Sequence, residues 1–413
     1  MAKIAIMGHG VVGSGVAELL RKNSTNISQR IGQSIEISKI LDLREFNNLP
    51  YLDLFTKNFD DILKDDEISV VVETIGGLDP SYEFTKSLLK SGKSVVSSNK
   101  ELVAQKGDEL LSIARENHVN YLFEASVGGG VPIIRPIYSC LAANKIEYIC
   151  GILNGTTNFI ITKMLEDGLS FEEALALAKD KGYAEKDPTD DINGSDSNRK
   201  ICILASLAYG THIYPHEVCQ SGIECIELAD VDFARSIGCV IKLIGKARRL
   251  ENGKISIMVC PAFVSNSSKL ASVGGVYNAI LVKGDAVGEV LFVGQGAGKM
   301  PTASAVVADI INIVRAEKTF ISQSWKPSNG SIVQAHEQYE SRFYLRLKAR
   351  DAKEAREFVL KNYKSPVFLS RKDQPADEIA LTTGYMLESE IKDLTNLFSG
   401  HRIKQLSKLI ILD

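Results

Sequence analysis

The chain lacks the features that mark membrane, secreted and nucleic-acid-binding proteins. None of the apolar runs in its 413 residues reaches the roughly 18 residues that a membrane span requires. The N-terminal stretch "KIAIMG" resembles a strand and has no signal-peptide pattern. A net charge of −3 gives no electrostatic basis for binding nucleic acid or an anionic membrane. We therefore expect a protein of the cytoplasm that binds neither.

Cysteine is scarce and follows no pattern. The seven cysteines are an odd number and include no CxxC pair. Neither a disulfide framework nor a zinc site is expected from this spacing, and free thiols in a reducing compartment fit it better. The chain is too long for one compact domain, so two or three domains are expected.

A glycine motif follows the first predicted strand. Gly8, Gly10 and Gly13 form G-x-G-x-x-G, with Val11 and Val12 between them, and the segment reads as strand, tight turn and helix. In this motif the first glycine permits the turn, the second lets the backbone approach a pyrophosphate, and the third allows helix and strand to pack closely. The motif predicts a dinucleotide site, and a glycine-rich turn without a ligand is the alternative.

The second predicted strand ends in Asp42, where a Rossmann fold places the acid that binds the adenosine ribose. An acid there favours NAD and repels a 2′-phosphate. Arg44, however, could accept that phosphate, so the choice between NAD and NADP stays open. Solvated charges at a strand end are the alternative for both residues.

Strands and helices alternate up to about residue 135, which predicts a doubly wound α/β fold with a parallel sheet. Ligands bind outside the carboxyl ends of the strands in such sheets. Thr74, Lys100 and Glu124 fall at these ends, with Lys100 before a helix expected over 107–118. For Lys100 the alternative is an ordinary surface lysine.

Two segments in the middle of the chain combine turns with polar groups. The stretch "EASVGGGVPIIRP" is a backbone bend that could hold a cation with inward carbonyl groups or could act only as a hinge. Asn154, Gly155 and Thr156 begin a polar turn before an apolar helix, which is typical of residues that line a site.

A dense acidic segment precedes an apolar helix. "EKDPTDDINGSDSNRK", residues 185–200, holds five carboxylates. We expect Ser195 to be the N-cap and Asp196 to lie in the first turn, on the same helix face as Lys200. Because the rest of the helix is apolar, this pair must lie at the edge of a buried region, where a lysine held by an acid could donate a proton. The alternatives are a pair that only stabilises the helix and an acidic cluster that binds an amino-acid ammonium.

Six segments in the same order make the chain resemble the homoserine dehydrogenase family up to about residue 320. They are "GHGVVGSGV", "SSNKELVA", "EASVGGGVPIIRP", "GILNGTTNFI", "GYAEKDPTDDINGSDSNRK" and "GDAVGEVLFVGQGAGKMPTASAVVADI". The resemblance implies interconversion of L-homoserine and L-aspartate 4-semialdehyde with NAD or NADP, in threonine and methionine biosynthesis. It also implies a homodimer.

The resemblance assigns roles to individual residues. Lys200 corresponds to the general acid, Lys100 to a second lysine at the reacting carbon, and Asp196 to an acid that positions lysine and substrate. The implied substrate-binding residues are Glu185, Asp191, Asn154, Gly155 and Thr156. The implied cofactor-binding residues are the glycine motif, Asp42, Arg44, Thr74, Lys100 and Gly298. The implied sodium site consists of Glu124 with the carbonyl groups of Val127, Gly129 and Val131.

One residue and one segment depart from the family pattern. His9 stands inside the glycine motif, where a small or apolar residue is common, and could crowd the pyrophosphate or point outwards. The strand end "LDLRE" differs from the arginine-containing pattern of NADP-preferring members, which leaves the cofactor preference open.

The last residues predict a βαββαβ order that resembles an ACT domain. The usual effector loop with a glycine is replaced by "RDAKEAREF", so we expect a structural or dimer-forming domain without threonine feedback. It could extend the dimer to a tetramer. The expected domains are 1–135 with about 295–320 returning to it for the dinucleotide, 136–294 for substrate and dimerisation, a linker over 321–340, and the ACT-like domain over 341–413.

Two other readings are open. An aspartate-semialdehyde dehydrogenase type of enzyme needs a nucleophilic cysteine, but the cysteines lie mostly in apolar stretches, where a thiolate is disfavoured. A nucleotide-sensing regulatory protein would have no turnover, and the presence of both lysines and both acids argues against it.

Overall fold

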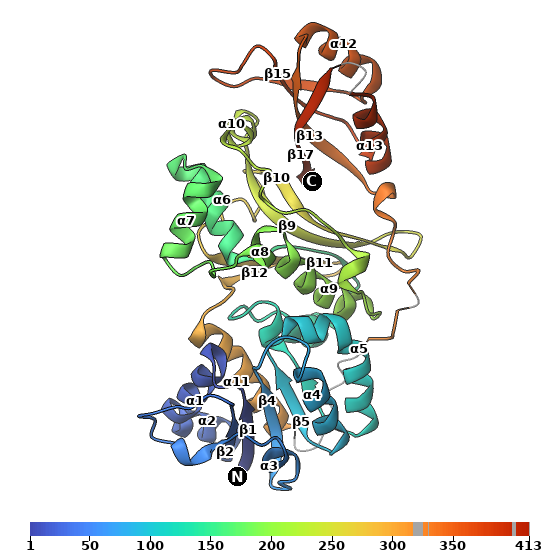
Figure 1. Ribbon diagram of the computed structural model, residues 1–413. Helices are drawn as coiled ribbons and strands as arrows, with labels where there is room; N and C mark the ends of the chain where they lie inside the picture. Colours follow the sequence, from blue (N-terminus) through green and yellow to red (C-terminus); the bar gives the residue numbers. More distant parts are fainter. Residues whose placement is uncertain (317–324, 329, 399–401, 413) are drawn as a thin grey trace.

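The computed structural model describes residues 1–413 except 317–324, 329, 399–401 and 413 (Figure 1). Figure 1 shows three layers of structure in a row, with the N-terminal sheet at one end, a mixed sheet in the middle and the C-terminal elements at the other end. Residues 321–324 and 329 of the expected linker, 317–320 of the expected returning segment, and 399–401 and 413 of the expected ACT-like domain lie outside the described part of the chain. Among the described residues, no helix combines the length and apolar character that crossing a bilayer requires.

The N-terminal sheet is parallel and has six strands in the order β3-β2-β1-β4-β5-β6. Its strands are β1 (Ala2–Met7), β2 (Ile35–Leu41), β3 (Phe55–Thr56), β4 (Ile68–Glu73), β5 (Ser94–Ser97) and β6 (Tyr121–Leu122). The helices that follow them are α1 (Val11–Lys22), α2 (Ser24–Ile31), α3 (Asp60–Leu63), α4 (Ser81–Lys90) and α5 (Lys100–Glu116). Both faces of the sheet are buried under helices, which explains its valine- and isoleucine-rich strands and confirms the doubly wound α/β prediction.

The start of α5 differs from the prediction. The helix begins at Lys100 and not near residue 107, because Asn99 caps it by accepting a hydrogen bond from the backbone N–H of Leu102. Lys100 is therefore the first residue of a buried helix. This placement fixes its backbone at the carboxyl end of β5.

Helix α11 (Lys299–Arg315) follows the middle part of the chain in sequence and packs on the N-terminal sheet. Its residues Ala303 and Val306 share an apolar cluster with Ile4 and Val16. The helix approaches α1 closely, since a Cβ at Gly15 would lie 2.9 Å from the carbonyl oxygen of Lys299. The segment just before α11 is thereby fixed next to the glycine motif's helix.

The middle of the molecule is a mixed sheet in the order β12-β11-β7-β9-β10. Its strands are β7 (Ile146–Ile152), β9 (Cys239–Arg249), β10 (Ile255–Ser265), β11 (Tyr277–Gly284) and β12 (Gly288–Gln295), with β8 (Cys219–Gln220) beside β10. The helices of this region are α6 (Gly155–Asp167), α7 (Phe171–Asp180), α8 (Thr189–Ile192), α9 (Ser195–Tyr209) and α10 (Leu228–Ser236). Helix α9 packs closely on β9, where Gly245 leaves room for Ile201.

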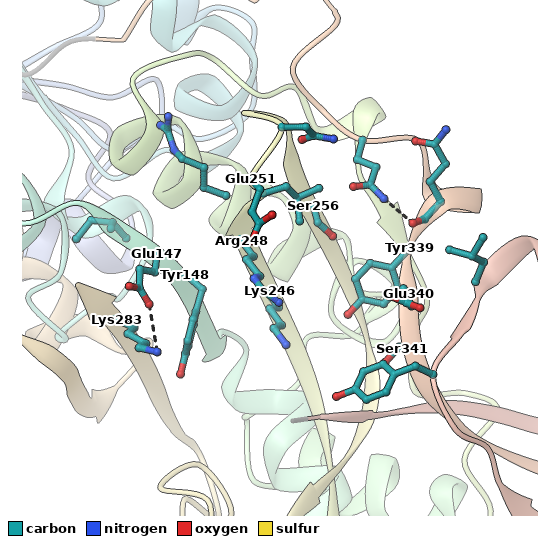
Figure 2. Close-up of a pocket in the computed structure, with 18 of the residues that line it drawn as sticks. Glu147, Tyr148, Lys246, Arg248, Glu251, Ser256, Lys283, Tyr339, Glu340 and Ser341 are labelled. Atoms are coloured by element: carbon teal, nitrogen blue, oxygen red, sulfur yellow. Dashed lines mark hydrogen bonds and ion pairs between the residues drawn. The ribbon is translucent and has the colours of Figure 1, made fainter. Parts of the chain in front are cut away.

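The opposite face of this sheet borders a cavity of about 1060 Å³ (Figure 2). Tyr148 of β7 and Lys246 and Arg248 of β9 point into it, and the residues from Tyr339 to Ser341 close its other side. The lining is strongly polar and carries charges of both signs. The acidic segment and its lysine lie on the other face of the sheet, so the cavity belongs to a different part of the molecule.

The C-terminal elements follow the βαββαβ order. They are β13 (Glu340–Ala349), α12 (Ala352–Asn362), β14 (Val367–Leu369), β15 (Glu378–Thr382), α13 (Glu388–Leu397) and β17 (Ile403–Leu412), with the short β16 (Met386–Leu387) beside β13. The strand order is β17-β13-β15-β14. The end of β17 also pairs in parallel with β10, so the two sheets form one continuous sheet of eleven strands. The sequence contains no sign of this junction.

A buried ionic network joins the C-terminal elements to α10. The Arg346 guanidinium lies 2.9 Å from Asp230, 2.9 Å from Glu227 and 3.3 Å from Glu378. The Arg346 side chain is 3% exposed and Asp230 is fully buried. Charges at this depth are stable only when they are paired, so the network fixes how the two parts meet.

Candidate active site

The glycine turn after β1 is shaped to receive a ligand at the N-terminus of α1. Gly8 has a φ of 90°, and a Cβ there would lie 2.8 Å from the carbonyl oxygen of Thr74. The Thr74 hydroxyl donates to the carbonyl oxygen of Gly8 at 2.8 Å and holds the turn. A Cβ at Gly13 would lie 1.9 Å from the same oxygen, whereas the nearest atom to a Cβ at Gly10 is 4.0 Å away. Gly10 is therefore open on the side where backbone N–H groups can bind a phosphate.

The Asp42 carboxylate accepts hydrogen bonds from neighbouring residues at all of its acceptor positions. It accepts hydrogen bonds from the backbone N–H of His9 at 2.7 Å and of Arg44 at 3.0 Å, and from the Arg44 side chain at 2.9 and 2.7 Å. The hydrogen bonds from Arg44 outweigh the effect of burial and lower the pKa of Asp42. A carboxylate offers about four acceptor positions, so Asp42 has none left for a ribose hydroxyl. Arg44 is 61% exposed and keeps free N–H groups.

The His9 side chain turns into the protein. Its ring is 6% exposed and contacts Phe46, Tyr51 and Phe55 edge-on, and its Nε2 lies 3.1 Å from the Tyr51 hydroxyl. Its imidazole therefore supports the strand end that carries Asp42 and does not face solvent.

Asp196 joins two lysines that come from different domains. Its Oδ2 lies 2.7 Å from the Lys200 Nζ and its Oδ1 lies 3.0 Å from the Lys100 Nζ. The side chain of Asp196 is 6% exposed, that of Lys200 10% and that of Lys100 41%. Because Lys100 starts α5 and Asp196 lies in the first turn of α9, this ion pair crosses between the nucleotide-binding and middle domains.

Two further groups fix this cluster. Lys200 also donates to the carbonyl oxygen of Leu153 at 2.8 Å. The side-chain amide of Asn154 donates to Asp191 at 2.7 Å and to Asp196 at 2.9 Å. Asn154 is itself held as the N-cap of α6, so both acids are oriented by a rigid helix end.

The electrostatics of the cluster follow from its burial. Burial alone would raise the pKa of Asp196, but Lys200 and Lys100 outweigh it and lower the pKa. Asp196 in turn raises the pKa of Lys100. Burial and the neighbouring Asp196 raise the pKa of Asp191. The shared anion thus favours the charged form of Lys100 and holds both amines in a place where a proton donor can act on a reacting oxygen.

The acidic segment differs from the prediction at the start of α9, whereas the predicted role of Glu185 stays a prediction. Gly194, with a φ of 87°, is the N-cap of α9, and Ser195 is already the first helical residue. The left-handed backbone that this turn requires suits glycine and not serine. Glu185 is exposed, and no hydrogen bond or ion pair joins it to the lysine cluster in the described part of the chain.

The remaining predicted substrate and cofactor residues lie at the N-terminal ends of helices α6, α11 and α1. The Thr156 hydroxyl donates to the carbonyl oxygen of Tyr183 at 2.6 Å, and Gly155 begins α6, where a Cβ would meet the carbonyl oxygen of Val276 at 2.7 Å. Gly298 is the N-cap of α11 with a φ of 120°. Val11 is 67% exposed at the start of α1.

One buried residue was absent from the sequence-based prediction. Asn278 is 1% exposed, and its side-chain amide donates at 3.0 Å to the same Leu153 carbonyl that holds Lys200. The amide packs against Gly296, where a Cβ would lie 2.0 Å from its nitrogen. A lone asparagine inside the apolar run "VYNAILV" is the signal that could have revealed it.

The Glu124 side chain has a structural role in addition to the predicted one, which stays a prediction. Its carboxylate accepts hydrogen bonds from the backbone N–H groups of Ile133, Ile134 and Arg135 at 2.6, 2.8 and 2.7 Å. It therefore closes the bend by binding three amides, which leaves about one acceptor position on the carboxylate. Within the described residues, no group of three or more His, Cys, Asp or Glu side chains is arranged to hold a metal ion.

Comparison with known proteins gives a consistent result over most of the chain. Residues 132–311 match the family model described as homoserine dehydrogenase, and residues 8–124 match the one described as homoserine dehydrogenase, NAD binding domain. The homoserine dehydrogenase of Lactococcus lactis is 40% identical over 320 residues, which are 76% of this chain and 74% of the relative. That of Pseudomonas aeruginosa is 40% identical over 360 residues, 84% and 82% of the two chains.

Comparison with solved structures also gives homoserine dehydrogenases. A homoserine dehydrogenase from Thiobacillus denitrificans superposes with a TM-score of 0.90 at 34% identity, covering 100% of this chain and 98% of the other. A hyperthermophilic archaeal homoserine dehydrogenase in complex with NADPH superposes with a TM-score of 0.64 at 30% identity, covering 76% and 97%.

Proposed function

The chain belongs to the homoserine dehydrogenase family, and we propose that its lysine–acid cluster is where L-aspartate 4-semialdehyde and L-homoserine are interconverted. The observation that carries this assignment is the ion pair of Asp196 with both Lys100 and Lys200. It lies where the domain with the open glycine turn meets the domain with the acidic segment. The enzyme is an NAD(P)-dependent oxidoreductase.

Each residue of the cluster has a separate task in this proposal. The nicotinamide cofactor, when bound, supplies or accepts the hydride. Lys200 donates a proton to the oxygen of the reduced carbonyl and takes it back in the reverse direction. Lys100 places a second positive charge beside that oxygen and stabilises the negative charge that develops there. Asp196 holds both amines in position through its two carboxylate oxygens.

The acids beside the lysines suit the other end of the substrate. Asp191 and Asn154 line the buried side, next to Gly155 and Thr156, and would bind the amino-acid part of homoserine. Glu185, on the exposed segment after α7, would contact it from the solvent side.

The open surface around Arg44 favours NADP over NAD in this proposal. Arg44 neutralises Asp42 and fills its acceptor positions, so the repulsion of a 2′-phosphate is weak. The free N–H groups of Arg44 could bind that phosphate.

The alternative mechanism, in which a cysteine acts as the nucleophile, has less support than the lysine–acid mechanism. Burial raises the pKa of Cys150 to about 11 and that of Cys260 to about 12, which disfavours a nucleophilic thiolate. The described contacts of the lysine cluster include no cysteine.

The C-terminal domain is proposed to be an ACT-like, structural domain of a homodimer, which could extend to a tetramer. The strand order β17-β13-β15-β14 supports the ACT-like assignment. Asp351 caps α12 directly after β13 by accepting hydrogen bonds from the N–H groups of Lys353 and Glu354. This tight connection leaves no glycine loop for an effector.

Replacing Lys200 by methionine tests the proton donor. We expect the homoserine-dependent reduction of NADP, followed by absorbance, to fall by at least about 100-fold, because a positioned acid–base group contributes that much. The exposed Lys179→Met variant is the matched control and should keep its rate. Full activity in Lys200→Met would remove Lys200 from the mechanism.

Replacing Arg44 by serine tests the cofactor preference. The ratio of kcat/KM for NADP to that for NAD should fall by about tenfold or more, because a charge-assisted partner of the phosphate is lost and Asp42 is freed for the ribose. Arg30→Ser, an exposed change on α2, is the control. An unchanged ratio would contradict this role of Arg44.

We propose a sodium site at this bend, formed by Glu124 with the backbone oxygens of Val127, Gly129 and Val131. Sodium chloride should then raise the thermal midpoint relative to choline chloride at equal ionic strength. Identical midpoints in the two salts would speak against a site in this bend.

Threonine should leave the protein unaffected. We expect no rise in the thermal midpoint on titration with L-threonine, and an unchanged dimer mass in sedimentation. NADP serves as the positive control, because a bound ligand raises the midpoint. A rise with threonine would show that the C-terminal domain has kept an effector site.

A further inference from the structure

A thiol, an imidazole and a carboxylate meet where the middle sheet, the linker and the C-terminal domain join. Cys219 lies in β8, at the edge of β10. His336 begins a helical turn in the linker, and Glu388 is the first residue of α13. The His336 Nε2 lies 3.7 Å from the Glu388 Oε1. Three separate segments of the chain thus bring together a nucleophile, a base and an acid that orients the base.

These groups line a cavity of about 150 Å³ together with Cys260 and Lys408. Hydrogen bonds that the imidazole donates to the Cys219 sulfur and the Glu388 carboxylate raise the pKa of His336 to about 9, so the imidazole is protonated at neutral pH. Lys408, which contacts Glu388, adds a second positive charge, and the thiol of Cys260 faces the same space. The Cys219 sulfur thus shares a small cavity with two positively charged side chains, which is the setting typical of reactive cysteines.

Cys219 combines access with a charged partner. Cys260 is also partly exposed and lines the same cavity, but burial raises its pKa to about 12. Cys219 is partly exposed, whereas Cys150, Cys202 and Cys239 are buried and have raised pKa values because of that burial. Two cysteines, Cys140 and Cys225, are more exposed than Cys219. No His or Lys side chain is shown hydrogen-bonded to their sulfur atoms within the described contacts. They serve as internal controls for simple exposure.

The other face of β8 leads to the lysine cluster. Successive side chains of a strand point in opposite directions, so Gln220 points away from the cavity. Its amide donates to the Ser195 hydroxyl at 2.9 Å and accepts from the Asn198 side chain at 2.6 Å. Both partners flank Asp196 in the first turn of α9. A displacement of Cys219 therefore acts on the residue that holds the start of the helix carrying Asp196 and Lys200.

We propose that Cys219 is a reactive thiol that forms mixed disulfides with small disulfides and thereby controls the position of the head of α9. The Cys219 thiolate attacks one sulfur of a small disulfide RSSR. A Cys219–S–SR bond forms as the RS–SR bond breaks, and the leaving thiolate takes the proton of His336. The disulfide is the oxidant, and a free thiol reverses the step.

The first test uses the aromatic disulfide 5,5′-dithiobis(2-nitrobenzoic acid) on the full-length protein, with peptide mass spectrometry to count modification at each cysteine. Cys219 should react at least about tenfold faster at neutral pH than Cys140 or Cys225, because a thiolate and not a thiol is the nucleophile. The advantage should be lost in His336→Gln and reduced in Glu388→Gln, which keeps the side-chain volume. A Cys219 that reacts more slowly than Cys140, or at a rate independent of His336, would overturn the proposal.

The second test measures homoserine oxidation during the same reaction. This readout rests on the proposed function, whereas the labelling does not, so the two can fail separately. Activity should fall with modification of Cys219, return with dithiothreitol, and resist the reagent in Cys219→Ser but not in Cys140→Ser. Complete labelling of Cys219 without loss of activity in an active enzyme would contradict the coupling to α9.

Discussion

The buried carboxylate of Asp196 is the constraint on which the candidate site depends. A carboxylate at 6% exposure requires positive partners, and the chain provides Lys200 from the next turn of the same helix and Lys100 from another domain. The same contact therefore orients the proposed proton donor and sets how the nucleotide-binding and middle domains face each other. Two neighbouring residues hold the cluster from the turn before α6. Asn154 donates a hydrogen bond to Asp196, and the Leu153 carbonyl accepts hydrogen bonds from both Lys200 and Asn278.

The rest of the fold positions the two domains that the Lys100–Asp196 ion pair joins. Close helix packing at Gly15 and the return of α11 fix the segment around Gly298 beside the glycine turn. On the other side, β17 extends the middle sheet, and the buried Arg346 network ties it to α10. The C-terminal elements are thus continuous with the sheet that supports α9. Cys219 lies at this junction of the middle sheet with the C-terminal elements. Modification of a reactive Cys219 would therefore affect the sheet on which α9 packs.

The sequence predicted what depends on local patterns and left out what depends on distant contacts. The glycine motif, the alternation of strands and helices, and the shared helix face of Asp196 and Lys200 are local, and the structure has them. The sequence misplaced the starts of α5 and α9, because a single capping residue, Asn99 or Gly194, decides each one. The three amides bound by Glu124, the role of Asn278 and the pairing of β17 with β10 arise from residues far apart in the chain, where no spacing rule applies.

The most direct measurement of the central claim is the kcat/KM for L-homoserine in Asp196→Asn, with the exposed Asp190→Asn as the control. If Asp196 organises both lysines, kcat/KM should fall by about 100-fold or more. The shift of the thermal midpoint by NADP should remain as in the unmodified protein, because the glycine turn is intact. A variant that keeps most of its kcat/KM would contradict the account, since the two lysines would then act without the carboxylate that joins them.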